Sequence, residues 1–92
     1  MTKQQIYFFE ELSYIQEYCM NVALCNEKKF INVEELLKDV TGDVIYRIME
    51  LIDGYACELP KFNLVNIETG EVLNEGIELH DKCIKYLSKG KK

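Results

Sequence analysis

The chain has 92 residues, of which 48% are hydrophobic and 29% are charged, and its formal net charge is −5. This size and composition predict one compact globular domain over residues 1–92, with flexible ends at 1–3 and 89–92, and exclude a disordered or fibrous chain. The acidic balance argues against a nucleic-acid partner, because proteins that bind nucleic acids use Lys and Arg to displace counterions from phosphates.

Apolar residues occur only in short runs. The longest unbroken runs, residues 6–9 and 22–25, are four residues each, whereas a helix that crosses a bilayer needs about 20. Glu10 and Glu11 interrupt the N-terminal segment before it reaches the length of a secretory signal. We therefore expect a cytoplasmic protein with no membrane contact, in which the four cysteines are reduced thiols.

Residues 4–27 contain neither Gly nor Pro, and their apolar residues recur with the spacing of a helix. At 100° per residue, five apolar positions fall within an arc of about 80° and form the predicted core stripe. These positions are Phe8, Leu12, Ile15, Cys19 and Val22. Both flanks of the stripe are also apolar, with Tyr7, Tyr14 and Tyr18 on one side and Phe9 and Met20 on the other. The helix therefore has more apolar surface than one core face explains.

Two further helices are predicted to follow in close succession. Asn32 and the carboxylate three residues later fit a helix N-terminal capping pattern, which predicts a short helix that ends near Gly42. A third helix then begins at once, capped by Thr41 or Asp43, and ends near Gly54. Its inner stripe is Val44, Ile48, Leu51 and Tyr55.

The pattern changes after Pro60. Alternating apolar residues on either side of a turn that contains Gly70 predict a β-hairpin over residues 62–73. A last helix is predicted over residues 77–88, with Leu79, Cys83, Tyr86 and Leu87 on one side. The expected fold class is therefore α+β and mainly α: three N-terminal helices, one hairpin and one C-terminal helix (αααββα).

The only histidine, His80, precedes Cys83 by three residues on the predicted last helix, so both side chains reach the same side. These residues are two candidate zinc ligands. A structural zinc site needs four ligands, which usually arrive in close pairs, and Cys19, Cys25 and Cys57 do not have that spacing. Core packing explains the cysteines on helix stripes better, and we predict no metal and no cofactor.

A Cys–His nucleophile pair also needs a third group that orients the imidazole. Asp81 follows His80 but faces elsewhere on the helix, and Asp53 is interpreted as part of the solvated face of the third helix. The five glycines match neither Gly-rich phosphate-binding fingerprint. We therefore predict no catalytic residue.

The tyrosine flank of the first helix has two interpretations. Tyrosines commonly border a core with the ring inside and the hydroxyl in water. Alternatively, Tyr7, Tyr14 and Tyr18 form an interface together with Phe9 and Met20, because interfaces are enriched in Tyr, Phe and Met.

Two functional hypotheses follow. The favoured one is a small, acidic, non-enzymatic protein that acts through protein–protein contact by binding or inhibiting a partner, either as a homodimer or against a basic partner. The alternative is a small enzyme or ligand-binding protein whose site is assembled around His80 and Cys83, with Cys57 as a further member.

Overall fold

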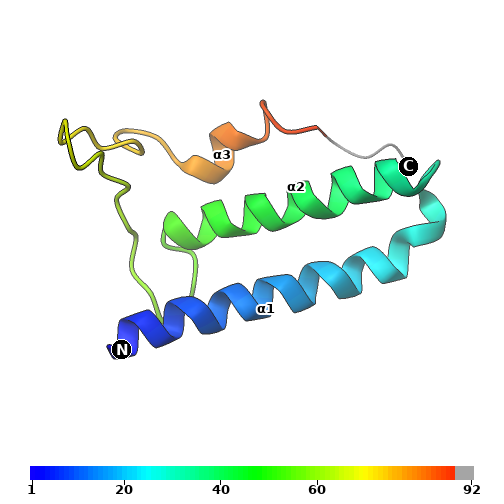
Figure 1. Cartoon of the computed structure of the whole chain (residues 1–92), viewed down its shortest axis with the longest axis horizontal. Helices are drawn as coiled ribbons and strands as arrows, with labels where there is room; N and C mark the ends of the chain where they lie inside the picture. The colour runs from blue at the N-terminus through cyan, green and yellow to red at the C-terminus, as the bar shows by residue number, and fades with distance from the viewer. Residues whose placement is uncertain (89–92) are drawn as a thin grey trace.

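The structure is a computed structural model in which residues 1–88 are described. Two long antiparallel helices, α1 (Lys3–Asn26) and α2 (Val33–Ile52), are joined by a single 3₁₀ turn, Glu27–Lys29 (Figure 1). The predicted first helix is confirmed. It begins with a capping box, in which the Thr2 hydroxyl accepts from the Gln5 amide at 3.1 Å and the Gln5 side chain accepts from the Thr2 amide at 2.7 Å.

The second and third predicted helices are one continuous helix, so the predicted break near Gly42 is wrong. A glycine inside a helix costs only about 1 kcal/mol relative to alanine, and the apolar stripe continues across it. The Thr41 hydroxyl donates back to the Leu37 carbonyl at 2.7 Å, and the Asp43 carboxylate pairs with Arg47 one turn ahead, so neither side chain caps a new helix. The predicted cap at Asn32 and the predicted end at Gly54, which has φ +98°, are confirmed.

The predicted β-hairpin over residues 62–73 is also wrong, and residues 1–88 form no strand. One isolated antiparallel bridge joins Val65 to Val72, around a turn in which the Gly70 amide donates to the Asn66 carbonyl. An isolated pair of strands is marginal without a surface to pack on, and Ile67 is 97% exposed. The fold is therefore helical and not α+β.

The buried Asn74 holds this irregular segment together. Its side-chain oxygen accepts from the Leu64 amide at 3.0 Å, and its side-chain nitrogen donates to the Phe62 carbonyl at 2.8 Å. A buried amide side chain needs partners for both groups, and these two bonds supply them. They act beside two backbone hydrogen bonds across the bridge, from the Leu73 amide to the Leu64 carbonyl at 2.7 Å and from the Asn66 amide to the Glu71 carbonyl at 2.8 Å.

The last helix is much shorter than predicted. α3 (Leu79–Cys83) lies beside α2 on the side away from α1 (Figure 1). Residues 84–88 form turns and a bend but no helix, and Tyr86 is largely exposed. The predicted helix over 77–88 is therefore confirmed only at Leu79–Cys83 and is wrong on both sides of it, and the predicted flexible end at 89–92 lies outside the described residues.

The hydrophobic core follows the seam between α1 and α2. Its buried members are Ile15, Cys19, Leu51 and Leu59, with Phe8, Leu12, Val40, Val44, Ile48, Ala56 and Phe62 packed against them. The helices form one layer, with overall extents of 43 × 28 × 20 Å. Within the described part of the chain, no helix is both long enough and apolar enough to cross a membrane.

Candidate functional site

The five residues predicted to form an interface on α1 are all exposed, but they do not share one surface. Tyr14 (65% exposed), with Tyr7 and Tyr18, lies on one face of the helix layer. Phe9 and Met20 (51% exposed) project about 120–140° from Ile15, on the side opposite to the tyrosines. The structure therefore separates the predicted set into a tyrosine face and an apolar face.

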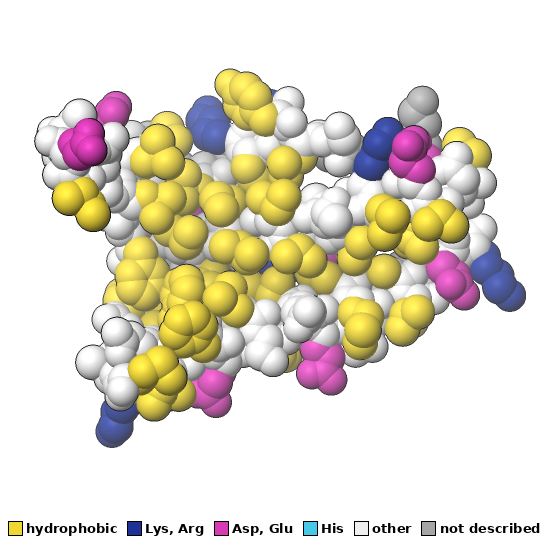
Figure 2. All heavy atoms as spheres, in the orientation of Figure 1, with side chains coloured by type: hydrophobic (Ala, Val, Ile, Leu, Met, Phe, Trp, Pro, Cys, Tyr) yellow, Lys and Arg dark blue, Asp and Glu magenta, His cyan; other side chains and the backbone are white. Residues whose placement is uncertain are grey.

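The apolar face consists of Phe9, Met20 and Leu24 of α1 with Leu37 and Ile45 of α2. It contains a groove of about 350 Å³ along the seam of the two helices. Figure 2 shows a band of hydrophobic side chains over this seam, with acidic and basic side chains around its margins. The residues that line the groove are Gln16, Cys19, Met20, Ala23, Leu24, Glu27, Leu36, Leu37, Val40 and Val44. Among these described residues, Glu27 is the one charged group.

This face arises from the sequence of both helices. The second apolar flank of α1 adds to its core stripe, and α2 carries Leu37 (54% exposed) and Ile45 beside its own core stripe. Because α3 lies beyond the other edge of α2, it does not cover the seam (Figure 1). The sequence predicted the α1 half of this face but not the α2 half, Leu37 and Ile45. These two residues could have been identified because the apolar stripe of α2 is wider than one core contact can bury.

The tyrosine face has different chemistry, because Arg47 occupies its centre. The guanidinium lies 5.1 Å from the centroid of the Tyr18 ring, and it pairs with Asp43 at 3.5 Å and Glu50 at 3.3 Å. Burial lowers the pKa of Arg47, but the two carboxylates outweigh burial and the net direction is upward. The charge of Arg47 is therefore matched within the chain, and Tyr14 stacks on Tyr18 beside it.

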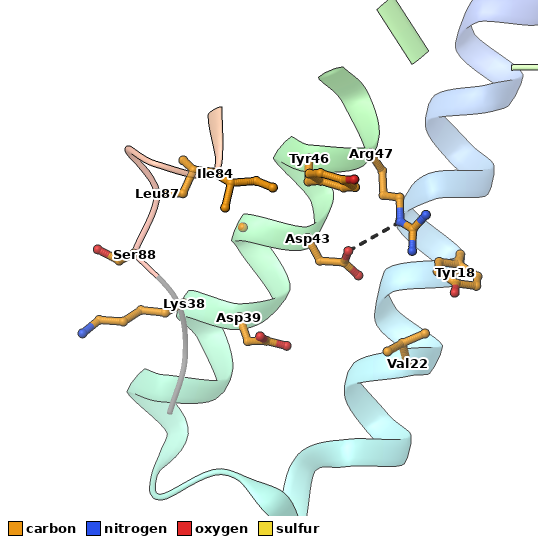
Figure 3. A pocket seen from close by; sticks show the side chains of 11 residues that line it. Tyr18, Val22, Lys38, Asp39, Asp43, Tyr46, Arg47, Ile84, Leu87 and Ser88 are labelled. Atoms are coloured by element: carbon orange, nitrogen blue, oxygen red, sulfur yellow. Dashed lines mark ion pairs between the residues drawn. The ribbon is translucent and has the colours of Figure 1, made fainter. Parts of the chain in front are cut away.

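A cavity of about 420 Å³ adjoins Arg47. Figure 3 shows Tyr18 and Val22 on α1 beside Asp43 and Arg47 on α2, while Ile84 and Leu87 lie on the far side of α2. The walls of this cavity contain apolar side chains and side chains of both charges. The dashed line in Figure 3 marks the ion pair between Asp43 and Arg47, which both line the cavity. This arrangement selects no ligand class.

Asp53, which the sequence predicted to be solvent-exposed, is buried between α2 and α3. Its carboxylate is fully buried and accepts from the Leu79 amide at 2.9 Å, the His80 amide at 2.9 Å and His80 Nδ1 at 2.6 Å. The interpretation of Asp53 as a solvated residue is therefore wrong. It lies at the C-terminal end of α2 and satisfies the free amides at the start of α3.

His80 is held on several sides at once. Its ring packs edge-on against the rings of Tyr46 and Tyr55, with centroids 5.6 and 5.1 Å away. The hydrogen bond to Asp53 raises the pKa of His80, although partial burial opposes it. Burial raises the pKa of Asp53, but hydrogen bonds from His80 and Leu79 outweigh it, and the net direction is downward.

The Asp–His arrangement orients an imidazole but does not activate a thiol. Cys83 Sγ donates to the His80 carbonyl at 3.6 Å, and burial raises the pKa of this thiol. A nucleophilic cysteine needs the opposite shift. Nε2 of His80 lies 3.6 Å from a carboxylate oxygen of Glu78. The geometry therefore ties α3 to α2 and brings no nucleophile to the imidazole.

The cysteines are not gathered into a metal site. Cys19 is buried, and burial followed by a hydrogen bond to Asp43 raises its pKa to about 11. Cys25 and Cys57 are exposed, and all four cysteines are free thiols. In residues 1–88, no group of three or more His, Cys, Asp or Glu side chains is placed to hold a metal ion.

Comparison with protein-family models, curated proteins and solved structures finds no match to this chain.

Proposed function

We propose that this chain acts through protein–protein contact at the apolar face of α1 and α2. The observation that supports the proposal is the concentration of large, exposed apolar side chains over one groove whose lining residues include a single charged one. Scattered exposed hydrophobic residues are normal on a protein, whereas a contiguous apolar patch with a polar margin is typical of an interaction surface.

The energetics favour an occupied groove. Burying a whole Leu, Phe or Met side chain contributes about 1.5–3 kcal/mol. Phe9, Met20, Leu24 and Leu37 are each a little more than half exposed, so covering each one contributes about 1 kcal/mol. Phe9 lies outside the groove lining, so a partner gains several kcal/mol from all four side chains only where it covers the whole apolar face, before the entropy of association is subtracted.

The charge of the groove lining also indicates which kind of partner segment the groove favours. An acidic chain attracts basic partners at a distance, but of the described groove residues only Glu27 offers a carboxylate. An apolar segment fits this surface better than a basic one. The four free thiols support placing the contact in a reducing compartment such as the cytoplasm.

The test is a comparison of single charge substitutions on the two faces. Affinity capture from the native cell supplies candidate partners, and each is then purified and its direct binding to the full chain is measured. We expect Met20→Lys and Leu37→Lys each to weaken binding at least about tenfold, because a lysine ammonium is costly to bury in an apolar contact. Ile67→Lys, a control at a 97% exposed turn residue, should leave binding unchanged.

Tyr14→Lys separates the two faces of α1. If the apolar face makes the contact, this substitution has little effect. Binding that is lost with Tyr14→Lys but unchanged with Met20→Lys and Leu37→Lys would contradict the proposal and assign the contact to the tyrosine face. Far-UV circular dichroism of each variant checks that α1 and α2 remain helical.

A further inference from the structure

We infer that the occupant of the apolar face is a second copy of this chain, which completes a four-helix arrangement. This inference rests on the proposed function and names its partner. It starts from the architecture, in which α1, α2 and α3 lie side by side in one layer, with a shortest extent of 20 Å (Figure 1). Stable domains bury their apolar stripes between two packed layers, and residues 1–88 supply one.

The surface area of the chain has the size that such an interface requires. The structure exposes 6929 Å², whereas a folded monomer of 10.8 kDa exposes about 5,500 Å². The excess is about 1,400 Å². A stable protein–protein interface covers about 800 Å² on each partner, so one dimer contact accounts for more than half of this excess.

The radius of gyration agrees with the surface area. It is 15.1 Å, whereas a compact chain of 92 residues has a value of about 12 Å. A flat, elongated layer buries less apolar surface per residue than a compact domain does. Packing a second layer on the apolar face corrects this deficit.

The face has the shape and charge that a copy of itself requires. Met20, Leu24 and Leu37 protrude beside the groove that they help to line, so a two-fold axis places each set against the groove of the other copy. Paired antiparallel helices of about 36 and 30 Å, from 24 and 20 residues, suit a four-helix bundle. Each chain has a formal charge of −5, but the groove centre is apolar, so like charges remain at the margin.

The first experiment measures mass and methionine reactivity on the unaltered chain. Sedimentation equilibrium over about 1–100 µM, which covers the weak end of the affinities of interfaces of this size, should give twice 10.8 kDa at the upper end. Peroxide oxidation with peptide mass spectrometry then compares Met20 with Met1, which is 85% exposed. We expect Met20 to react several-fold more slowly than Met1 at high concentration, with the protection lost on dilution.

The second experiment uses Met20→Glu and Leu37→Glu, one on each helix, with Ile67→Glu as the matched control. Each face variant should raise the dissociation constant of the dimer at least about tenfold, and the control should not. If a face variant fails to fold, protection of Met20 in the unaltered chain decides the question.

Two results would overturn the inference. One is a monomer at the highest concentration in which Met20 and Met1 oxidise at similar rates. The other is a dimer that neither protects Met20 nor responds to the two face variants, because such a dimer uses another surface. A monomer that still binds a different purified protein through Met20 and Leu37 would refute the second copy and leave the proposed function intact.

Discussion

Replacing Asp53 with asparagine tests the connection between α2 and α3. One oxygen of the buried carboxylate accepts from the Leu79 amide, and the other accepts from both the amide and Nδ1 of His80. Asparagine offers one oxygen, so at least one amide faces an NH₂ group and is left unpaired. Hydrogen bonds to charged groups contribute about 1.5–3 kcal/mol, and an unsatisfied buried donor costs about 1–3 kcal/mol. We expect the free energy of unfolding to fall by about 2–4 kcal/mol in Asp53→Asn.

Urea unfolding followed by circular dichroism measures this change at one fixed protein concentration. With a slope of about 1–1.5 kcal/mol/M for a chain of this size, the midpoint should fall by about 2 M. Asp81→Asn is the matched control, because this α3 carboxylate is largely exposed and should shift stability by no more than about 0.5 kcal/mol. If Asp53→Asn unfolds at the same urea concentration as Asp81→Asn, the buried carboxylate does not hold α3.

The same pair sets a pH dependence whose sign follows from the two pKa directions. The pKa of His80 is raised in the folded chain, so its contribution to stability is complete below the ordinary value of about 6.5 and is lost as pH rises through the folded pKa. The pKa of Asp53 is lowered, so its contribution is present above its ordinary value and is lost as pH falls through the folded pKa. Asp53→Asn should flatten both declines, and an unchanged pH profile would refute the coupling.

Two glycine substitutions and one labelling experiment test other parts of the fold. Gly42→Ala should raise the free energy of unfolding by about 0.5–1 kcal/mol, because this helical position has room for a methyl group. A lower free energy of unfolding in this variant would indicate a helix break at Gly42 and contradict the continuous α2. Gly54→Ala should lower it by at least about 1 kcal/mol, since φ is +98° and the new Cβ would lie 3.0 Å from Lys61; urea midpoints measure both. A thiol reagent at neutral pH should label the exposed Cys25 quickly and the buried Cys19 only on unfolding, and equal rates would contradict the burial of Cys19.

Features that depend on neighbours along the chain could be predicted from the sequence, and features that depend on distant segments could not. The cap at Asn32 and the helix end at Gly54 could be predicted from the sequence, because each depends on atoms within about four residues. The prediction of a helix break at Gly42 was wrong because it also relied on a local signal. A single glycine disfavours a helix only weakly, and the core contacts of Val44, just after it, favour a continuous helix.

The candidate sites show the same division. Sequence analysis recognised that α1 is apolar around too much of its circumference. The split into two faces needed the position of α2, which buries one stripe and leaves Met20 beside Leu37. His80 attracted attention as a lone histidine, but its partner Asp53 is 27 residues away and no local pattern links them.

The sequence by itself determined where the two long helices begin and which of their sides are apolar. Only the tertiary structure decided that residues 62–73 form no sheet, that Asp53 holds the start of α3, and that one apolar flank stays uncovered. The physical reason is range. Caps and helical stripes arise from neighbours along the chain, whereas burial of a flank depends on which other segment reaches it, and here α3 packs on the other edge of α2.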